Sequence, residues 1–246
     1  MHEIHSQGIL ISNFNDVKAE ATRHFSDLFK EQPIGDASDL LNLIPKAINN
    51  IQNEDLNHIV TLEEIKQAID GMEDDRAPGP DGYNATFIKL CWDIIKIDLF
   101  KMVSSSQRRS KIGGSTNSTF LALIPKEKEA KTFDRFRPIS LCNIGYKAIT
   151  KIIANRLKNI LPRIIPENQG GFVKNRKIWE NIILTQEAIH SSLKNGDQGM
   201  VIKIDLANAF DRVSHPFLLK VMQKFGFSSK FISWIKACIS KPWIDP

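Results

Sequence analysis

Helical spacing of apolar residues dominates this chain, and strand-like segments are few. Apolar residues recur at intervals of three and four through most of the chain, a spacing that predicts amphipathic helices. We expect helices at about 13–30, 61–72, 84–104, 145–161, 178–194, 208–225 and 229–240. Only residues 119–126 and 199–205 have the short apolar pattern of strands, and Pro125 ends the first of them. Many helices and few strands predict a helix-rich α+β fold with a small sheet.

Turn and capping signals separate these elements. Thr61 and Glu64 have the spacing of a capping box, so a helix should begin there. Residues 78–82 (PGPDG) contain two prolines and two glycines, which favour a tight turn between helices. Asn195-Gly196 is expected to turn the chain into the strand 199–205.

Positive charge is concentrated in one part of the chain. Residues 105–177 contain 16 lysines and arginines but only 4 acidic residues, although the net charge of the whole chain is +5. A solvated basic face could arise from composition alone. A basic block of this length between acidic segments is more typical of a surface for a polyanion, so nucleic acid or another phosphate-bearing partner is expected.

The remaining composition argues against several classes of protein. The 3 cysteines are unevenly spaced and lack metal-ligand spacing, which argues against a disulfide framework and against a zinc site. No apolar run approaches the roughly 20 residues that a membrane-spanning helix needs, and the first residues lack the pattern of a signal peptide. We therefore expect an intracellular chain with no membrane partner.

One carboxylate stands out by its position. Asp205 ends the predicted strand 199–205, and Asp211 follows it closely. A two-metal phosphoryl-transfer site needs an acid on a rigid strand end, because the geometry of Mg²⁺ ligands tolerates little movement. The simpler explanation is a strand that ends in solvent before a helix with polar first residues. A single aspartate does not decide between the two.

Longer motifs favour the first explanation. They occur in the order of one known family: LALIPK (121–126), FRPISLCNIGYKAITKIIANRL (136–157), QGGF (169–172) and IDLANAFDRV (204–213). Together they resemble the reverse transcriptase of non-LTR (LINE-type) retrotransposons, most of all its plant members. RAPGPDG (76–82) followed by FIK (87–89) is similar to the segment that precedes the fingers in that family.

The resemblance implies the right-hand fold of polymerases, with the fingers and the first part of the palm present. Residues 105–246 would form this incomplete reverse transcriptase domain, with a small and incomplete antiparallel sheet. Residues 61–104 would be a helical extension that carries the PGPDG turn, and residues 1–60 an N-terminal helical region. An incomplete sheet should leave an exposed edge and an uncovered apolar face.

The resemblance also implies roles for residues of the last motif. Asp205 matches the first catalytic aspartate, and together with the carbonyl of Leu206 it would bind Mg²⁺. Phe210 falls at the position where a bulky ring excludes the ribose 2′-hydroxyl and so selects deoxynucleotides, while Ala209 keeps the backbone close to the triphosphate. Asp211 is expected to be structural, as a cap of the next helix.

Residues upstream match the fingers of the family. Lys126 and Arg137 would grip the triphosphate of the incoming nucleotide, since an ammonium group and a guanidinium fork both suit phosphate oxygens. A second group would lie near the template strand or contact the nucleic-acid backbone: Gln169, Gly170, Lys174 and Arg176. For each basic residue, the alternative is ordinary solvated surface charge.

The chain departs from the family after its last motif. Residues 211–246 contain neither the Ala-Asp-Asp motif, which carries the other catalytic carboxylates, nor a thumb. A C-terminal palm and thumb segment is therefore expected to be missing. One carboxylate cannot hold two divalent ions against their mutual repulsion, so we expect no polymerase activity from this chain alone.

Two functions remain open at this point. In the first, the chain is a fragment of a reverse transcriptase whose partners are an RNA template, a DNA primer and deoxynucleotides, acting in the nucleus or cytoplasm. In the second, it is a non-catalytic RNA- or DNA-binding module that uses the basic block 105–177. An unrelated Mg²⁺-dependent phosphotransfer protein would leave the ordered motifs unexplained.

Overall fold

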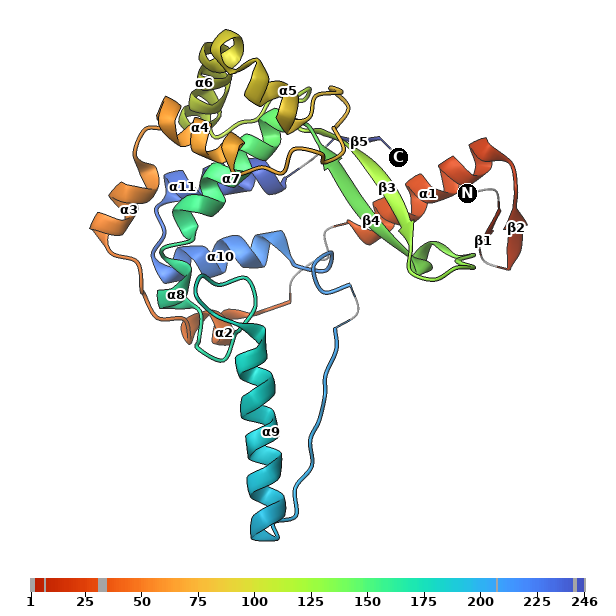
Figure 1. The fold of residues 1–246 in the computed structure, drawn as a ribbon, viewed down its shortest axis with the longest axis vertical. Coiled ribbons are helices and arrows are strands. Elements are labelled where there is room, and N and C mark those ends of the chain that lie inside the picture. Colours follow the sequence, from red (N-terminus) through yellow and green to blue (C-terminus); the bar gives the residue numbers. More distant parts are fainter. Residues whose placement is uncertain (1–2, 7, 31–34, 207, 241–242, 246) are drawn as a thin grey trace.

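The computed structural model describes residues 3–6, 8–30, 35–206, 208–240 and 243–245. A group of helices lies beside a small sheet, and one long helix projects away from both (Figure 1). The helices are α1 (Phe14–Leu28), α2 (Ser38–Asn42), α3 (Asn50–Asn57), α4 (Leu62–Asp70), α5 (Ala85–Leu90), α6 (Trp92–Arg109), α7 (Ile144–Leu157), α8 (Leu161–Ile164), α9 (Ile178–Asn195), α10 (His215–Phe225) and α11 (Ser229–Ile239). The strands are β1 (Ile4–Ser6), β2 (Ile9–Ile11), β3 (Ser118–Pro125), β4 (Phe136–Cys142) and β5 (Trp243–Asp245). The predicted helix-rich α+β class is confirmed.

Helix α7 lies at the centre of the helical group. Its residues Ala148, Ile149 and Ile152 have no exposed surface, and α3, α4, α6 and α11 all contact it. Trp234 of α11 is buried in the same cluster. Because the buried side chains of α7 recur at helical spacing, one face of this helix is removed from water and forms a central part of the hydrophobic core.

Side-chain caps determine where several helices begin. Thr61 Oγ1 accepts a hydrogen bond from the backbone N–H of Glu64 at 3.2 Å, which confirms the predicted start of α4. Asn49 and Gln52 form a reciprocal capping box at the start of α3. Each cap satisfies backbone donors that have no partner within the helix.

Three predicted helices differ clearly from their expected bounds, and one of them, expected at 145–161, ends at Leu157 before the separate α8. The helix expected at 84–104 is divided at Cys91, whose backbone angles (φ −91°, ψ 12°) interrupt the regular helix, and α6 then continues to Arg109. The helix expected at 208–225 begins only at His215, because residues 208–212 form a turn and Ser214 supplies the N-cap. Asp211 therefore does not cap this helix, and the prediction that it does is wrong.

Strands β3 and β4 form an antiparallel ribbon that is covered on one face by α1. Leu121 of β3 and Phe136 of β4 are buried in one cluster with Val17 and Phe25 of α1. The strand β5 pairs with β3 in parallel, and β1 with β2 forms a separate antiparallel hairpin. Of these strands only β3 was predicted, at 119–126, because no strand was expected at the residues of β4. The parallel strand and the hairpin were not predicted.

A buried arginine connects four helices of the helical group. Arg156 of α7 donates two parallel hydrogen bonds to the Glu64 carboxylate of α4, each at 2.7 Å, and a third at 2.8 Å to the carbonyl of Leu56 in α3. The guanidinium carbon lies 5.5 Å from the centre of the Trp234 ring of α11. Only 4% of the arginine side chain is exposed. Its charge is therefore balanced by a bidentate partner rather than by water.

The PGPDG turn is held against the start of α7 by one asparagine. Asn143 accepts a hydrogen bond from the Asp81 backbone N–H at 3.0 Å and donates one to the Ser115 carbonyl at 2.7 Å. A Cβ atom on Gly79 would come within 2.5 Å of Asn143. Position 79 therefore requires glycine, because any side chain would force the turn away from Asn143.

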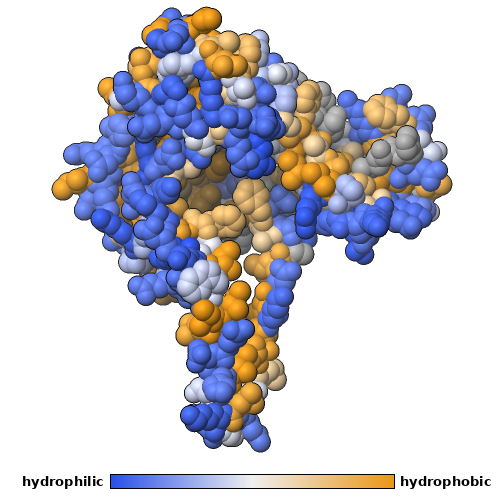
Figure 2. Space-filling view, in the orientation of Figure 1, coloured by the Kyte–Doolittle hydropathy of each residue, from blue (hydrophilic) through white to orange (hydrophobic). Residues whose placement is uncertain are grey.

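Helix α9 and the chain that follows it project from the rest of the molecule (Figure 1). None of the residues of α9 is buried. Gly196 ends the helix with φ 71°, so the turn predicted at Asn195-Gly196 is confirmed as a helix C-cap. Figure 2 shows hydrophobic residues along this projecting part. Among the helices of the described residues, none is long and apolar enough to cross a membrane.

We predict that Arg156→Leu lowers the free energy of unfolding by about 3 kcal/mol, because it leaves the Glu64 carboxylate largely buried without its partner. Urea denaturation at pH 7, followed by tryptophan fluorescence, measures the change. Lys101→Ala is the control, since Lys101 pairs with Asp98 at the exposed surface and should change the stability by less than about 1 kcal/mol. A loss below about 1 kcal/mol in Arg156→Leu would contradict the assigned role.

Candidate active site

The ribbon of β3 and β4 brings together the two basic residues predicted to hold a triphosphate. Ile124 lies opposite Arg137, and the backbone N–H of Lys126 bonds to the carbonyl of Arg135 at 2.8 Å, which continues the same register. Residues opposite each other, and those two apart along a strand, share a face. Lys126 and Arg137 therefore lie on the same face of the ribbon, opposite to the face that α1 covers.

The two basic side chains have different surroundings. Lys126 Nζ donates a hydrogen bond to the Asp134 carbonyl at 2.8 Å, which directs this ammonium group along the loop before β4. Arg137 is exposed, and in the part of the chain that the structure describes no hydrogen-bond partner of its guanidinium is recorded. Arg137 is therefore the freer of the two to bind an anion.

The face of the ribbon that carries these residues is otherwise apolar and open. Phe120, Ile124 and Ile139 share it, and between 40% and 50% of each side chain is exposed. Figure 2 shows the surface hollowed between the helical group and the sheet, with hydrophobic residues on the walls of the hollow. The uncovered apolar face predicted from the sequence is thus confirmed.

Asp205 is not held by a strand. Residues 197–206 have no regular secondary structure, and Val201, Ile202 and Ile204 are each exposed by more than 60%. The predicted strand 199–205 is therefore wrong. A strand needs a neighbour for its backbone donors and acceptors, and none of the described residues pairs with this segment.

The other residues predicted from the last motif lie in the same exposed connection. Leu206 and Phe210 are exposed by 72% and 92%, and Ala209 is exposed as well. Asn208, with φ 51°, opens a turn in which its carbonyl accepts hydrogen bonds from the N–H groups of Asp211 and Arg212 at 3.0 and 3.2 Å. The ring of Phe210 therefore projects into solvent from a tight turn.

Asp211 links this connection to the ribbon. Partial burial raises the pKa of the Asp211 carboxyl above its ordinary value, and the positive charge of Lys126 acts in the opposite direction. The turn at residues 208–212 therefore lies within electrostatic reach of Lys126. The charge of Lys126 thus acts on a residue of the turn that follows Asp205.

The described residues do not form a magnesium site by themselves. No three His, Cys, Asp or Glu side chains gather closely enough to hold a metal ion within the described ranges. Asp205 offers one exposed carboxylate, and a two-metal site needs several carboxylates on rigid supports. A magnesium ion at Asp205 would therefore need ligands beyond those that Asp205 and the Leu206 carbonyl could supply.

The residues predicted near the template lie in a separate loop between α8 and α9. Gln169 Nε2 donates to the Gly171 carbonyl at 3.3 Å, and Lys174 Nζ donates to Asn159 Oδ1 at 3.1 Å. Gly170 packs against the start of α9, where a Cβ atom would meet Asn181 at 3.1 Å. Arg176 hydrogen-bonds four carbonyls of this part of the chain. Arg176 therefore holds the loop between α8 and α9 together, and a contact of this residue with nucleic acid stays a prediction.

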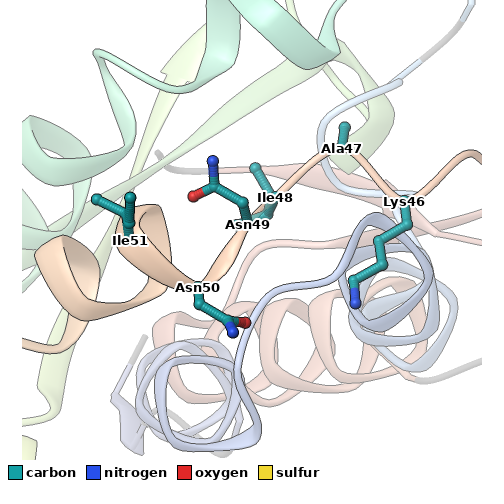
Figure 3. A pocket seen from close by; sticks show the side chains of 6 residues that line it. All are labelled: Lys46, Ala47, Ile48, Asn49, Asn50 and Ile51. Carbon is teal, nitrogen blue, oxygen red and sulfur yellow. The ribbon is translucent and has the colours of Figure 1, made fainter.

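A pocket of about 480 Å³ lies apart from all of these residues (Figure 3). It is lined by the continuous segment 46–51 that leads into α3. The N–H groups of Ala47 and Ile48 both bond to the carbonyl of Phe225, each at 2.9 Å, so the segment is fixed to the end of α10. None of the predicted site residues lines this pocket.

Sequence reasoning overlooked the residues that position the ribbon. Asn143 and Gly79 join the PGPDG turn to the end of β4, and nothing in their local pattern reveals a contact between segments so distant in the sequence. The available signal was Gly79 between two prolines, since glycine in a rigid turn often marks a close approach of two backbones.

Comparisons with known proteins place the second half of the chain in a family. The family described as "Reverse transcriptase (RNA-dependent DNA polymerase)" matches residues 124–245. A transposon TX1 protein of 149 kDa from Xenopus laevis is 28% identical over 89% of this chain. The RNA-directed DNA polymerase from mobile element jockey of Drosophila funebris is 28% identical over 65% of it. A probable RNA-directed DNA polymerase from transposon BS of Drosophila melanogaster is 28% identical over 67%. The chain spans only 17% to 18% of the length of these relatives.

We predict that Asp211→Asn stabilises the chain at pH 7 but not at pH 3. The raised pKa means that the folded state disfavours the carboxylate charge, so stability is lost as pH rises through the folded pKa. Urea denaturation at both pH values measures the difference, which should stay within about 0.5 kcal/mol for a partly exposed group.

Lys126→Met provides the test of the proximity between Asp211 and Lys126. Without the lysine charge the carboxylate is disfavoured further, so the gain from Asp211→Asn at pH 7 should be larger in this background. Additive effects of the two substitutions would show that the turn and Lys126 do not interact.

Proposed function

Residues 124–245 are part of a reverse transcriptase domain of the non-LTR retrotransposon type, and we propose that the chain supplies the fingers and the first part of the palm of such a polymerase. In this proposal residues 105–246 are the polymerase part, and residues 61–104 and 1–60 are a helical extension and an N-terminal region. The chain would act on an RNA template with a DNA primer and deoxynucleotides.

The observation that carries the proposal is the position of Lys126 and Arg137. Both lie on the open face of the β3–β4 ribbon, and the turn after Asp205 lies within electrostatic reach of Lys126. An incoming triphosphate needs cations on one side and the catalytic carboxylate on the other. This arrangement supports a nucleotide site between the ribbon and the connection 205–211.

Each residue has a distinct task in this site. Arg137 would bind the triphosphate as a fork of donors, and Lys126 would add a point charge. Phe210 would form a wall beside the sugar and exclude a 2′-hydroxyl, with Ala209 keeping the backbone close to the nucleotide. Asp205 and the carbonyl of Leu206 would be ligands of Mg²⁺, which supplies charge stabilisation in the intact family.

The chain alone is expected to have no polymerase activity. Asp205 is exposed on an irregular connection, and a working site needs further carboxylates and a rigid support. We propose that a further palm and thumb segment provides both, since the relatives are several times longer than the matched region.

A non-catalytic nucleic-acid-binding module remains the second candidate, because the basic block 105–177 also suits that role. In the structure, less of the positive charge of this block is available to bind nucleic acid. Arg156 is buried in its pair with Glu64, and Arg176 is occupied by backbone carbonyls. The free cations of the block are therefore fewer than the sequence suggests.

Primer extension on an RNA template, with Mg²⁺ and deoxynucleotides, tests the catalytic part of the proposal. We expect no product from the wild-type chain or from Asp205→Ala. If the wild-type chain extends the primer and the Asp205→Ala variant does not, the expectation that the chain alone is inactive is wrong. Asp205 would then be catalytic in this chain.

Binding of a fluorescently labelled deoxynucleoside triphosphate tests the role of the ribbon. Lys126→Ala with Arg137→Ala should weaken this binding about tenfold, because charge-assisted contacts to the triphosphate are lost. Lys96→Ala with Lys101→Ala is the matched control, because these lysines lie on α6 in exposed ion pairs. An equal reduction of affinity by both pairs would refute the assigned site.

A further inference from the structure

A pocket of about 520 Å³ lies in the loop between α8 and α9. Its walls combine apolar side chains, an aromatic ring and two amides, from Leu161, Ile165, Pro166, Asn168, Gln169, Gly171, Phe172 and Val173. The volume is within the range of about 300–1,000 Å³ that ligand pockets usually have. An apolar lining with a few amides is typical of a site for a flat heteroaromatic group rather than for a metal ion.

Arg176 preorganises this pocket. Its guanidinium donates to the carbonyls of Ile165 at 2.7 Å, Pro162 at 3.1 Å and Gln169 at 3.2 Å, and also to the carbonyl of Pro166. Asn181 of α9 donates to the carbonyl of Asn168 at 2.8 Å. The loop that forms the walls is therefore fixed by side chains from outside it, so little ordering is required when a ligand enters.

Phe172 is presented to solvent in an unusual conformation. Its side chain is fully exposed, and its backbone φ of 61° is uncommon for a bulky residue. An exposed ring contributes nothing to the core, and the conformation costs free energy. A ring held in this way at a pocket is available to stack against a ligand.

The charge around the pocket suits a polyanion. Residues 158–177 contain five lysines and arginines against one acidic residue, Glu167. Arg163 lies between two residues of the pocket wall, and Lys174 directly follows another. Both are exposed. Phosphates on either side of a bound group would therefore meet cations, and Glu167 is the only acidic residue within 158–177.

We propose that this pocket binds an unpaired base of single-stranded nucleic acid. The base stacks on Phe172, the amides of Asn168 and Gln169 meet its polar edge, and Arg163 and Lys174 hold the neighbouring phosphates. The inference rests on the proposed function, because it places a nucleic-acid strand on this side of the molecule. It adds a pocket for a base, where the sequence indicated only that this segment lies near the template strand or contacts the nucleic-acid backbone.

A duplex does not fit this arrangement. A paired base is stacked on both faces and has its polar edge occupied, so it can neither cover Phe172 nor reach the amides. The site therefore selects strands with a free base, and it should tolerate different bases because each has a π-face.

Fluorescence anisotropy with labelled single strands of about 12 nucleotides tests the proposal. Phe172→Gly is the informative variant, because glycine adopts φ 61° without strain and the exposed ring packs against nothing. It should weaken binding about tenfold and leave the salt slope unchanged, since no cation is removed. Phe172→Trp should restore the affinity by supplying another ring. Phe14→Ala removes a ring that is 75% exposed on α1 and should have no effect.

The choice of probes separates base recognition from phosphate binding. A strand whose bases are replaced by abasic sites should bind the wild-type chain and the Phe172→Gly variant with equal affinity. The affinity for a blunt duplex should likewise be the same for both proteins. RNA and DNA single strands are compared in parallel, and the strand that binds more tightly shows which of the two nucleic acids the pocket prefers.

Two results would overturn the proposal. If Phe172→Gly binds base-bearing strands as tightly as the wild-type chain does, while the salt dependence remains steep, the chain binds nucleic acid but not through this pocket. The proposed function then survives. If the wild-type chain binds no strand at all, both the pocket and the proposed nucleic-acid role fail.

Discussion

The buried pair of Arg156 and Glu64 is the interaction on which the arrangement of the helices depends. One guanidinium contacts α3, α4 and α11 from its place in α7, through hydrogen bonds to Glu64 and to the Leu56 carbonyl and through the ring of Trp234. A buried charge is tolerable only under that condition. The pair therefore constrains the relative positions of four helices more narrowly than apolar packing could, because hydrogen bonds depend on direction and hydrophobic contacts do not.

The position of the β3–β4 ribbon depends on the position of α7, because Asn143 connects the two. Helix α7 begins directly after β4, and Asn143 lies between them. Its amide holds the PGPDG turn on one side and the loop before β3 on the other, and Gly79 allows the close approach. Lys126 and Arg137 are thus positioned by contacts far from the ribbon face that presents them. A change at Gly79 would be expected to move the ribbon relative to α7 without touching either cation.

The open apolar surfaces have one common physical cause. The ribbon is covered by α1 on one face only, and the connection 197–206 has no neighbouring strand among the described residues. An isolated strand cannot satisfy its backbone groups or bury its side chains. The alternating sequence around Asp205 is therefore suited to a sheet that these residues do not form, and the carboxylate lacks the rigid support that metal binding requires.

The sequence by itself determined the local elements and the family. Capping at Thr61 and the apolar spacing of α4 and α7 act between residues a few positions apart, so the sequence shows them directly. The ordered motifs indicated the reverse transcriptase family, which matches residues 124–245. Only the tertiary structure decided which side chains meet. Arg156 contacts a carbonyl 100 residues away, Arg176 organises a pocket instead of remaining free, and the predicted strand at Asp205 stays irregular. The contacts of both arginines involve partners distant in the chain, and a strand at Asp205 would need a neighbouring strand; a local pattern carries no information about such partners.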